Sequence, residues 1–312
     1  MFWRINLLTF HSQENIFMPL PLYQDKKKDD PSLSAHSLDR VKAVIAIAAG
    51  KGGVGKSTVT VNLALGLQAE GFKVGIMDTD IYGPSIRKML PEDRLPSQRG
   101  ALIEPALCLG IKMISMAYFR KEGEATAVRA PIANGLIAHF IKNIQWGDLD
   151  FLLVDFPPGT GDIQLTLSQQ AHLMGAIMVT TPQEVALIDV RKAMSLFDLV
   201  KVPIIGIIEN MSYYKTDVQS EPLYLFGRGG GERLARESGA PFLGSIPLDP
   251  SVCQCGDQGQ SLFSVDSQVE RPATQAFKQI AKELIEQVNG LKKQGEKGMQ
   301  SFELVWKEMS AL

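Results

Sequence analysis

Cysteine is scarce in this sequence, and its scarcity limits how the chain is held together. Cys108, Cys253 and Cys255 are the only three in 312 residues. Because disulfide-built proteins are small and rich in paired cysteines, this count excludes a disulfide scaffold. It favours a reducing compartment, so we expect a cytoplasmic protein. Metal-site spacing is also absent from the four histidines, which are His11, His36, His139 and His172.

A strong net charge and long apolar runs are missing too. The chain has 32 Lys and Arg against 34 Asp and Glu, a net charge of -2, so it has no strong field for nucleic acid. No run approaches the roughly 18 apolar residues of a membrane-spanning helix. We therefore expect neither a nucleic-acid partner nor a membrane span. With 45% hydrophobic and 21% charged residues, the composition is that of an ordinary globular protein.

The first forty residues are predicted to form a flexible extension. A block of charges from Asp25 to Asp30 is followed by Pro31 and several serines, a composition typical of a solvated segment. Only Arg4 precedes the first apolar patch, and polar residues interrupt that patch, so the pattern does not match a secretory signal. We expect a folded domain over residues 41–290 and a C-terminal tail over residues 291–312.

Short apolar runs alternate with longer amphipathic stretches throughout the predicted domain. This alternation predicts parallel strands joined by helical crossovers. Several runs are apolar on both faces, as a sheet covered on each side by helices requires. The expected fold is therefore α/β, with a doubly wound, mostly parallel sheet and helices on both faces. The predicted strands are residues 44–48, 73–77, 111–115, 151–155, 176–180, 204–209 and 242–246.

A helix is predicted to close the domain. Phe277, Ile280, Leu284 and Val288 recur at helical spacing, and Asn289-Gly290 offers a stop. The apolar stripe is interpreted as core packing rather than as a partner site.

The strongest local signal directly follows the first predicted strand. Residues 50–58 fit the pattern G-x-x-x-x-G-K-[ST] and precede a predicted helix over residues 59–68. Such glycines let backbone N–H groups point at phosphate, and the following helix adds its positive end. We expect Lys56 to reach the terminal phosphates and Ser57 to ligate Mg²⁺. The residues expected to bind ATP are Gly50, Lys51, Gly52, Gly53, Val54, Gly55, Lys56, Ser57 and Thr58.

Three acidic residues follow predicted strands. Asp78 and Asp80 come directly after the second strand, and Asp155 ends the apolar run that starts at Phe151. Carboxylates at the carboxyl ends of parallel strands face the ligand crevice. We expect Asp155 to hold magnesium through water and Asp78 to neighbour the magnesium shell. Asp80 is expected to position the attacking water or accept its proton.

Lys51 is an unusual residue for a phosphate-binding loop. The run from Lys51 to Thr58 resembles the signature of the MinD/ParA class. Members of that class dimerise around ATP and place this lysine against the partner's nucleotide. The resemblance implies that Lys51 acts across a homodimer interface and takes part in catalysis with Lys56 and Asp80. The alternative is a solvated lysine.

Further motifs narrow the resemblance. They are similar in order and spacing to the Mrp/ApbC family of iron-sulfur cluster carrier ATPases over about residues 40–290. The motifs are Asp78-Thr-Asp-Ile-Tyr-Gly-Pro-Ser85, Asp155-Phe-Pro-Pro-Gly-Thr-Gly-Asp162, Thr181-Pro-Gln-Glu184, Glu209-Asn-Met-Ser-Tyr213, Phe226-Gly-Arg-Gly-Gly230 and Pro241-Phe-Leu-Gly-Ser-Ile-Pro-Leu-Asp-Pro250. The resemblance implies an ATP-hydrolysing carrier that works with iron-sulfur scaffolds and recipient apoproteins. It places Asn210, Pro247 and Asp249 around the adenine; alternatively, Asn210 caps a turn at a strand end.

Two departures from the family stand out. The first forty residues are too short for the small N-terminal domain that many members carry. The family usually has a C-x-x-C just after Asn-Met-Ser-Tyr, and this chain has no cysteine there. Cys253 and Cys255 are then the only paired thiolates, and two subunits would supply four ligands for a [4Fe-4S] cluster. Alternatively they are two half-buried small residues, because in a helix their side chains would point in widely separated directions.

A second class of function is a positioning or partitioning ATPase of the MinD/ParA kind without a cluster. Attachment to a membrane would require a basic amphipathic C-terminal helix. The tail after Gly290 is basic but contains further glycines, and it fits that requirement poorly.

Overall fold

The computed structural model describes residues 37–80, 83–100, 102–119, 130–159, 161–215, 221–264 and 271–309. The predicted flexible extension, residues 1–40, lies almost wholly outside the described residues. Near the predicted domain start, Val41 forms an isolated parallel bridge with Leu149. Within the described part of the chain, no helix is long and apolar enough to span a bilayer.

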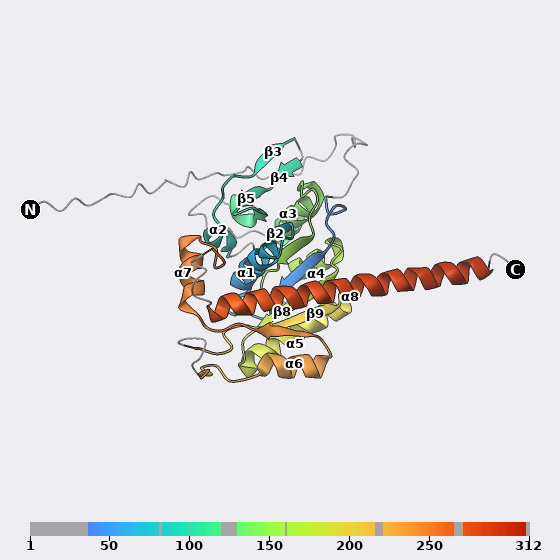
Figure 1. Cartoon of the computed structure of the whole chain (residues 1–312). Helices are drawn as coiled ribbons and strands as arrows, with labels where there is room; N and C mark the ends of the chain where they lie inside the picture. The colour runs from blue at the N-terminus through green and yellow to red at the C-terminus, as the bar shows by residue number, and fades with distance from the viewer. Residues whose placement is uncertain are drawn as a thin grey trace, which may run out of the picture.

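An eight-stranded sheet forms the centre of the molecule (Figure 1). Its order is β10-β9-β8-β1-β7-β2-β6-β5, and every neighbouring pair is parallel except β5 and β6. The mostly parallel α/β sheet predicted from the sequence is confirmed. The strands are β1 (Val44–Ala48), β2 (Val74–Asp78), β5 (Ala106–Cys108), β6 (Ile111–Ser115), β7 (Phe151–Asp155), β8 (Gly175–Thr180), β9 (Ile204–Glu209) and β10 (Phe242–Ser245).

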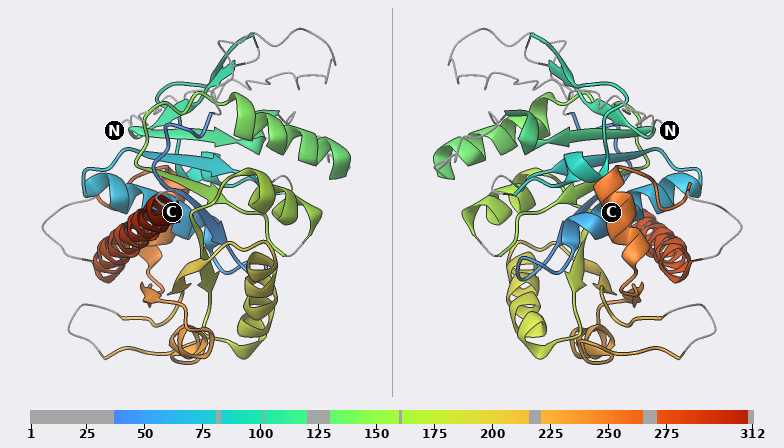
Figure 2. Two further views of the ribbon diagram at one scale, coloured as in Figure 1. Left: turned by 90° about the vertical axis from the view of Figure 1, so that its right-hand side faces the viewer. Right: turned by 90° about the vertical axis from the view of Figure 1, so that its left-hand side faces the viewer.

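Helices cover both faces of this sheet. Helices α1 and α8 pack together on one face, and α3, α4 and α5 lie on the other (Figure 2). Two short strands, β3 (Ser97–Arg99) and β4 (Leu102–Glu104), form a separate antiparallel pair. The helices are α1 (Lys56–Ala69), α2 (Ile86–Met89), α3 (Ala130–Asn143), α4 (Asp162–Gln170), α5 (Glu184–Leu199), α6 (Gly230–Ser238), α7 (Pro250–Gln258) and α8 (Pro272–Met309), with a 3-10 turn at Met116–Phe119.

The central strands are buried on both faces, as their composition requires. Every residue of β1, β2, β7 and β8 is buried. The seven predicted strands all form, and their ends differ from the prediction by at most one residue. The sequence did not predict β3, β4 or β5, because strands of three residues carry too little periodicity.

Helix α8 differs from the prediction at its C-terminal end. The predicted stop at Asn289-Gly290 is wrong, since the helix continues to Met309. A glycine inside a helix costs only about 1 kcal/mol relative to alanine, and no proline follows to end this helix. The interpretation of its apolar stripe as core is confirmed: Phe277, Leu284 and Val288 are buried.

The strand order determines where a ligand can bind. Strand β1 lies between β7 and β8: the chain goes from β1 toward β2 on one side, and the later crossover from β7 passes β1 to reach β8 on the other side. In open parallel sheets, ligands bind at such a switch point, outside the carboxyl ends of the strands. The loop after β1 and the acids that end β2 and β7 all lie at this edge.

Candidate nucleotide site

The loop between β1 and α1 has a backbone that only glycine allows at two positions. Gly55 has φ of 79°, and a Cβ added there would lie 2.3 Å from the Asn210 side-chain nitrogen. A Cβ at Gly50 would lie 2.1 Å from the carbonyl carbon of Asp189 on α5. The loop is therefore held closely between the end of β9 and α5.

The side chains after this loop converge on Asp155. The Lys56 Nζ lies 2.6 Å from the Asp155 Oδ2, and the Ser57 hydroxyl donates to the same oxygen at 2.7 Å. On the next turn of α1, the Thr60 hydroxyl donates to Oδ1 at 2.6 Å. Asp155 is fully buried, so these donors stabilise a carboxylate that water does not reach.

Asp78 lies beside this centre on the neighbouring strand. It pairs in register with Asp155, and the Ser115 hydroxyl donates to its Oδ2 at 2.7 Å. Burial, together with the nearby Asp155 charge, raises the pKa of Asp78 to about 7. The Asp78 carboxyl group therefore keeps its proton up to about neutral pH.

Asp80 lies at the rim of the same site. Its backbone N–H donates to the Asp78 Oδ1 at 3.2 Å, and its own Oδ1 accepts from the backbone N–H of Gly83 at 3.1 Å. Asp80 is half-buried, whereas Asp78 is fully buried. Of these two carboxylates, the more accessible one is therefore Asp80, which was predicted to position the attacking water or accept its proton.

A cavity of about 290 Å³ adjoins the phosphate-binding loop, and we call it the base cavity because residues predicted to surround adenine line it. Gly55 and Asn210 line it together with Pro247 and Asp249. The Asn210 amide donates to the Val54 carbonyl at 2.8 Å, so a side chain that lines the cavity also holds the phosphate-binding loop in place. The structure thus gathers the residues predicted to surround adenine, and their contact with a base stays a prediction.

Lys51 is half-buried in the loop between β1 and α1. It makes no ion pair with any described residue, and among those residues nothing lies within 4 Å of a Cβ added at Gly52 or Gly53. Two apolar side chains, Val185 and Ile188, are exposed on α5, the helix whose Asp189 contacts Gly50. The helix that contacts the loop at Gly50 thus presents two exposed apolar side chains.

A family model agrees with this geometry over most of the chain. The model is described as ParA, NUBPL iron-transfer P-loop NTPase, and it matches residues 40–285. The chain belongs to this family. It is therefore a P-loop NTPase, an ATP-hydrolysing enzyme, and the phosphate-binding loop after β1 is the motif that gives such enzymes their name.

Curated relatives of this P-loop NTPase carry a common name. An iron-sulfur cluster carrier protein of Methanocaldococcus jannaschii is 44% identical over 260 residues, which are 82% of this chain and 88% of the relative. A protein of the same name in Synechocystis is 43% identical over 259 residues, covering 81% of this chain and 73% of the relative.

Solved structures give the same fold. A nucleotide-binding protein of Archaeoglobus fulgidus, in complex with ADP, is 37% identical with a TM-score of 0.65 and covers 76% of this chain and 96% of its own. The cell division ATPase MinD of Pyrococcus furiosus is 22% identical with a TM-score of 0.57, covering 78% and 99%. The second likeness shows the fold alone.

The two paired cysteines of this NTPase do not converge. Cys253 and Cys255 both lie on α7, where residues two apart point in widely separated directions. Cys253 is exposed and lines the base cavity, whereas Cys255 is buried and its pKa is raised by that burial. No group of three or more metal-binding side chains occurs among the described residues. This arrangement does not fit a shared iron-sulfur cluster.

Sequence reasoning missed several polar groups that hold the site together. Thr60 and Ser115 support Asp155 and Asp78, and buried Glu209 accepts from the Ser212 hydroxyl and from the Gly231 N–H at 2.6 Å. One signal was available: Thr60 follows Lys56 by four residues and so lies on the same helix face. Ser115 and Glu209 end strands at the ligand edge, as the predicted acids do.

Proposed function

We propose that this P-loop NTPase binds ATP with Mg²⁺, dimerises around the nucleotide and serves as an iron-sulfur cluster carrier. The observation that carries the ATPase part is the convergence of Lys56, Ser57 and Thr60 on buried Asp155. These contacts put a cation, a hydroxyl and a carboxylate in one place beside the base cavity. A glycine-rich turn without a ligand has no need of this arrangement.

The oxygen atoms at the carboxyl edge of the sheet fit magnesium. Mg²⁺ prefers carboxylate, hydroxyl and water oxygens, and the Ser57 and Asp155 oxygens lie 2.7 Å apart with Asp78 on the adjacent strand. In our proposal Ser57 and Asp155 hold the ion, which neutralises charge on the phosphates when bound. Lys56 then exchanges its carboxylate partner for phosphate oxygens.

Hydrolysis in this proposal uses Asp80 as the group that orients the attacking water. Asp80 is the accessible carboxylate of the site, and the Gly83 N–H fixes one of its oxygens. Asp78 is less suited to that role because burial and the nearby Asp155 charge raise its pKa to about 7.

The proposed dimer rests on Lys51 in the phosphate-binding loop, which in the proposal meets the nucleotide of a second copy. Exposed Val185 and Ile188 on α5, the helix whose Asp189 contacts Gly50, support an interface near the loop. Sedimentation of the protein with and without a non-hydrolysable ATP analogue tests this. We expect Lys51→Ala to bind nucleotide as a monomer, whereas Lys42→Ala, whose exposed side chain pairs with Asp150 outside the site, behaves like the parent. Equal dimerisation of the Lys51 variant would demote Lys51 to a solvated lysine.

The proposed cargo rests on the family and on the names of the relatives. The thiols of α7 give it no support, because Cys255 is buried while Cys253 is exposed. Anaerobic reconstitution of the parent and of a Cys253→Ser/Cys255→Ser variant, with bound iron counted and the visible band recorded, tests both parts. Equal cluster in the two proteins would place the ligands elsewhere. Absence of cluster from both would leave an ATPase that does not carry this cargo.

One observation favours the second candidate, a positioning or partitioning ATPase. Helix α8 continues through Gly290 to Met309, so the glycines do not break the tail as the sequence suggested. Lys292 and Lys293 lie at the start of this extension. ATP-dependent co-sedimentation with anionic liposomes, lost on truncation after residue 294, would favour this function. Equal co-sedimentation with and without ATP would count against it.

A further inference from the structure

The chain leaves the hydrogen-bond ladder of the sheet just after Asp155. Phe156 is still attached, because its N–H donates to the Ile47 carbonyl at 3.0 Å. Pro157 and Pro158 come next, and proline has no N–H to donate. Pro157 is buried, so its carbonyl requires a partner within the protein. The segment that follows the metal-side acid therefore depends on a group outside the sheet to hold its position.

Gln164 on α4 is the group that holds this segment. Its side-chain Nε2 donates to the Pro157 carbonyl at 3.1 Å and to the Pro158 carbonyl at 2.9 Å. A side-chain amide has two N–H donors, so both bonds can form at once. Gln164 is only 4% exposed, and water therefore competes little for its amide. One buried side chain thus fixes two successive carbonyls.

The same amide lies inside the curve that the chain makes at two glycines. Gly159 has a φ of 97°, which favours glycine, and a Cβ added there would lie 3.8 Å from the Gln164 Nε2. A Cβ added at Gly161 would lie 3.3 Å from the Gln164 Oε1. Residues on both sides of the curve therefore approach this one side chain.

Gln164 is itself held firmly by the body of the protein. Its neighbours on α4, Ile163 and Leu167, are buried in the core. The Gln164 carbonyl accepts from the Ser168 hydroxyl at 2.7 Å, and α4 lies on the face of the sheet that α3 and α5 also cover (Figure 2). The two side-chain hydrogen bonds thus connect the segment after Asp155 to a helix that is packed on the core.

We propose that Gln164 is a positioning residue for ATP hydrolysis. By holding the Pro157 and Pro158 carbonyls, it sets the path of the chain that leaves Asp155, the acid that pairs with Lys56. Misplacing a reacting group by about 1 Å can cost about 100-fold in rate, so a residue that fixes this path affects the reaction. This role rests on the proposed function of Asp155 in the ATPase site.

The hydrogen bonds themselves are tested in the nucleotide-free protein, so this result does not depend on the ATPase. Gln164→Met keeps the length of the side chain and removes both donors. We expect amide hydrogen exchange in the peptide that contains Gly159 and Gly161 to become about tenfold faster, because the segment opens more easily. Mass spectrometry measures the exchange, and circular dichroism verifies folding. Unchanged exchange in this peptide would overturn the proposal.

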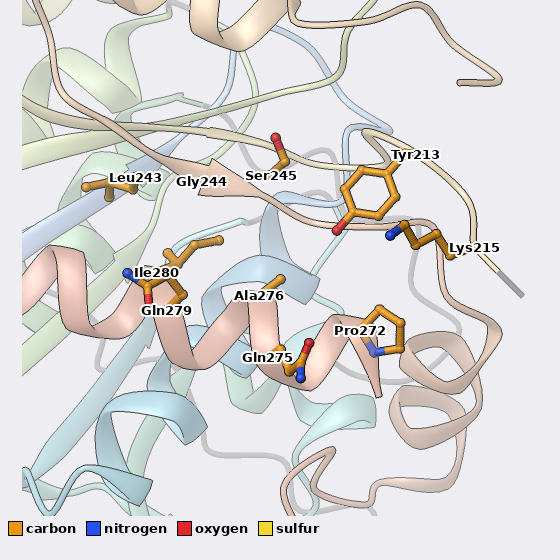
Figure 3. Close-up of a pocket in the computed structure, with 10 residues that line it drawn as sticks. All are labelled: Tyr213, Lys215, Leu243, Gly244, Ser245, Pro272, Gln275, Ala276, Gln279 and Ile280. Atoms are coloured by element: carbon orange, nitrogen blue, oxygen red, sulfur yellow. The ribbon is translucent and has the colours of Figure 1, made fainter. Parts of the chain in front are cut away.

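Gln279 offers a matched control on the other face of the sheet. It lies on α8, beside a cavity of about 270 Å³ between β10 and that helix, and it donates to Glu283 at 2.8 Å (Figure 3). Gln279→Met therefore loses a side-chain hydrogen bond without touching the segment after Asp155. Its exchange near Gly159 and its ATP hydrolysis should match those of the parent. Losses equal to those of Gln164→Met would show a general effect of such substitutions and overturn the assignment.

The role in hydrolysis is measured by separating kcat from nucleotide affinity. Gln164→Met should lower kcat about 20-fold and leave ADP affinity within about twofold, because none of its contacts reaches the base cavity. A parental kcat in this variant would overturn the positioning role alone. A parent that does not hydrolyse ATP would overturn the proposed function and this role with it.

Gln164→Glu adds a dependence on pH that a merely structural role would not produce. A protonated carboxyl group donates one hydrogen bond, whereas a carboxylate donates none. We expect burial to raise the pKa of this glutamate, so that it loses its proton between about pH 6 and pH 9. The ratio of its kcat to that of the parent should fall over this range, while the ratio for Gln164→Met stays constant. ADP affinity measured at each pH verifies that the site is intact. A ratio for Gln164→Glu that stays at the level of Gln164→Met at every pH would overturn the role of the donated bond.

Discussion

The phosphate-binding loop and helix α7 both border the base cavity, and the sequence predicted ligands in each. In the loop, the predicted groups meet: the Lys56 Nζ and the Ser57 hydroxyl lie within 2.7 Å of one Asp155 oxygen. In α7, the predicted pair separates, with Cys253 exposed and Cys255 buried. The two regions differ in whether their sequence motif also determines the backbone conformation.

The loop motif itself specifies the backbone conformation, because glycines such as Gly55 adopt a positive φ that other residues avoid. Two cysteines with one residue between them carry no such instruction. Asp249 caps α7 by accepting from the Ser251 N–H at 2.8 Å, and Pro250 starts the helix, so this segment is helical. In a helix that spacing separates the thiols.

The largest expected effect concerns the phosphate-binding loop, where the predicted groups meet. Lys56→Ala should lower ATP hydrolysis at least about 100-fold, because it removes the cation aimed at the phosphates. A steady-state phosphate-release assay measures this, and circular dichroism verifies that the domain is folded. Lys42 precedes β1, at the edge of the sheet opposite the phosphate-binding loop, so Lys42→Ala should leave the rate unchanged. Parental activity in the Lys56 variant would contradict the assignment of the loop.

The next effect separates two acids of the same site. Asp80→Asn should lower kcat about 100-fold with little change in ATP affinity, since it is proposed to serve the water. Asp155→Asn should instead raise the Mg²⁺ concentration for half-maximal activity by about tenfold, because Asp155 is proposed to hold the metal. Magnesium titrations and nucleotide-binding assays on both variants distinguish these roles. Equal losses of nucleotide affinity would mean that the roles are not separate.

A third prediction concerns the stability of the buried acids. Asp78→Asn should raise the free energy of unfolding of the nucleotide-free protein by about 4 kcal/mol at pH 8, since a neutral amide replaces a poorly solvated carboxylate. Asp78 has a folded-state pKa of about 7, above the 3.8 of the unfolded chain, so the parent loses stability as pH rises between these values. The gain should therefore grow from pH 4 to pH 7 and then level off. Urea unfolding at each pH measures it, and a pH-independent gain would refute this account.

The smallest expected effect concerns α7, where the two cysteines separate. Cys255→Ser should lower the free energy of unfolding by about 1 kcal/mol, because a hydroxyl replaces a buried thiol, while Cys253→Ser should leave it unchanged. Iodoacetamide should modify Cys253 first, since burial protects Cys255 and Cys108 and raises their pKa. Mass spectrometry follows the order of modification. Simultaneous reaction of Cys253 and Cys255 would show that α7 opens readily and that its thiols could meet.

Some elements were predictable because their signal is local. The central strands are short apolar runs buried on both faces, and the loop after β1 has a fixed pattern of glycines. The position of Asp155 followed from parallel-sheet geometry, which brings strand ends to one edge. The stop expected at Gly290 failed because the cost of one glycine is small beside a helix that is already packed on the sheet.

By itself, the sequence determined the fold class, the phosphate-binding loop and the acids at the carboxyl edge, since each depends on local spacing or on one rule of sheet topology. Only the tertiary structure decided that Thr60 and Ser115 support those acids and that Asn210 braces the loop. It also decided that Cys253 and Cys255 diverge. These contacts join residues far apart in the chain or depend on one segment being helical, and no local pattern encodes where such side chains point.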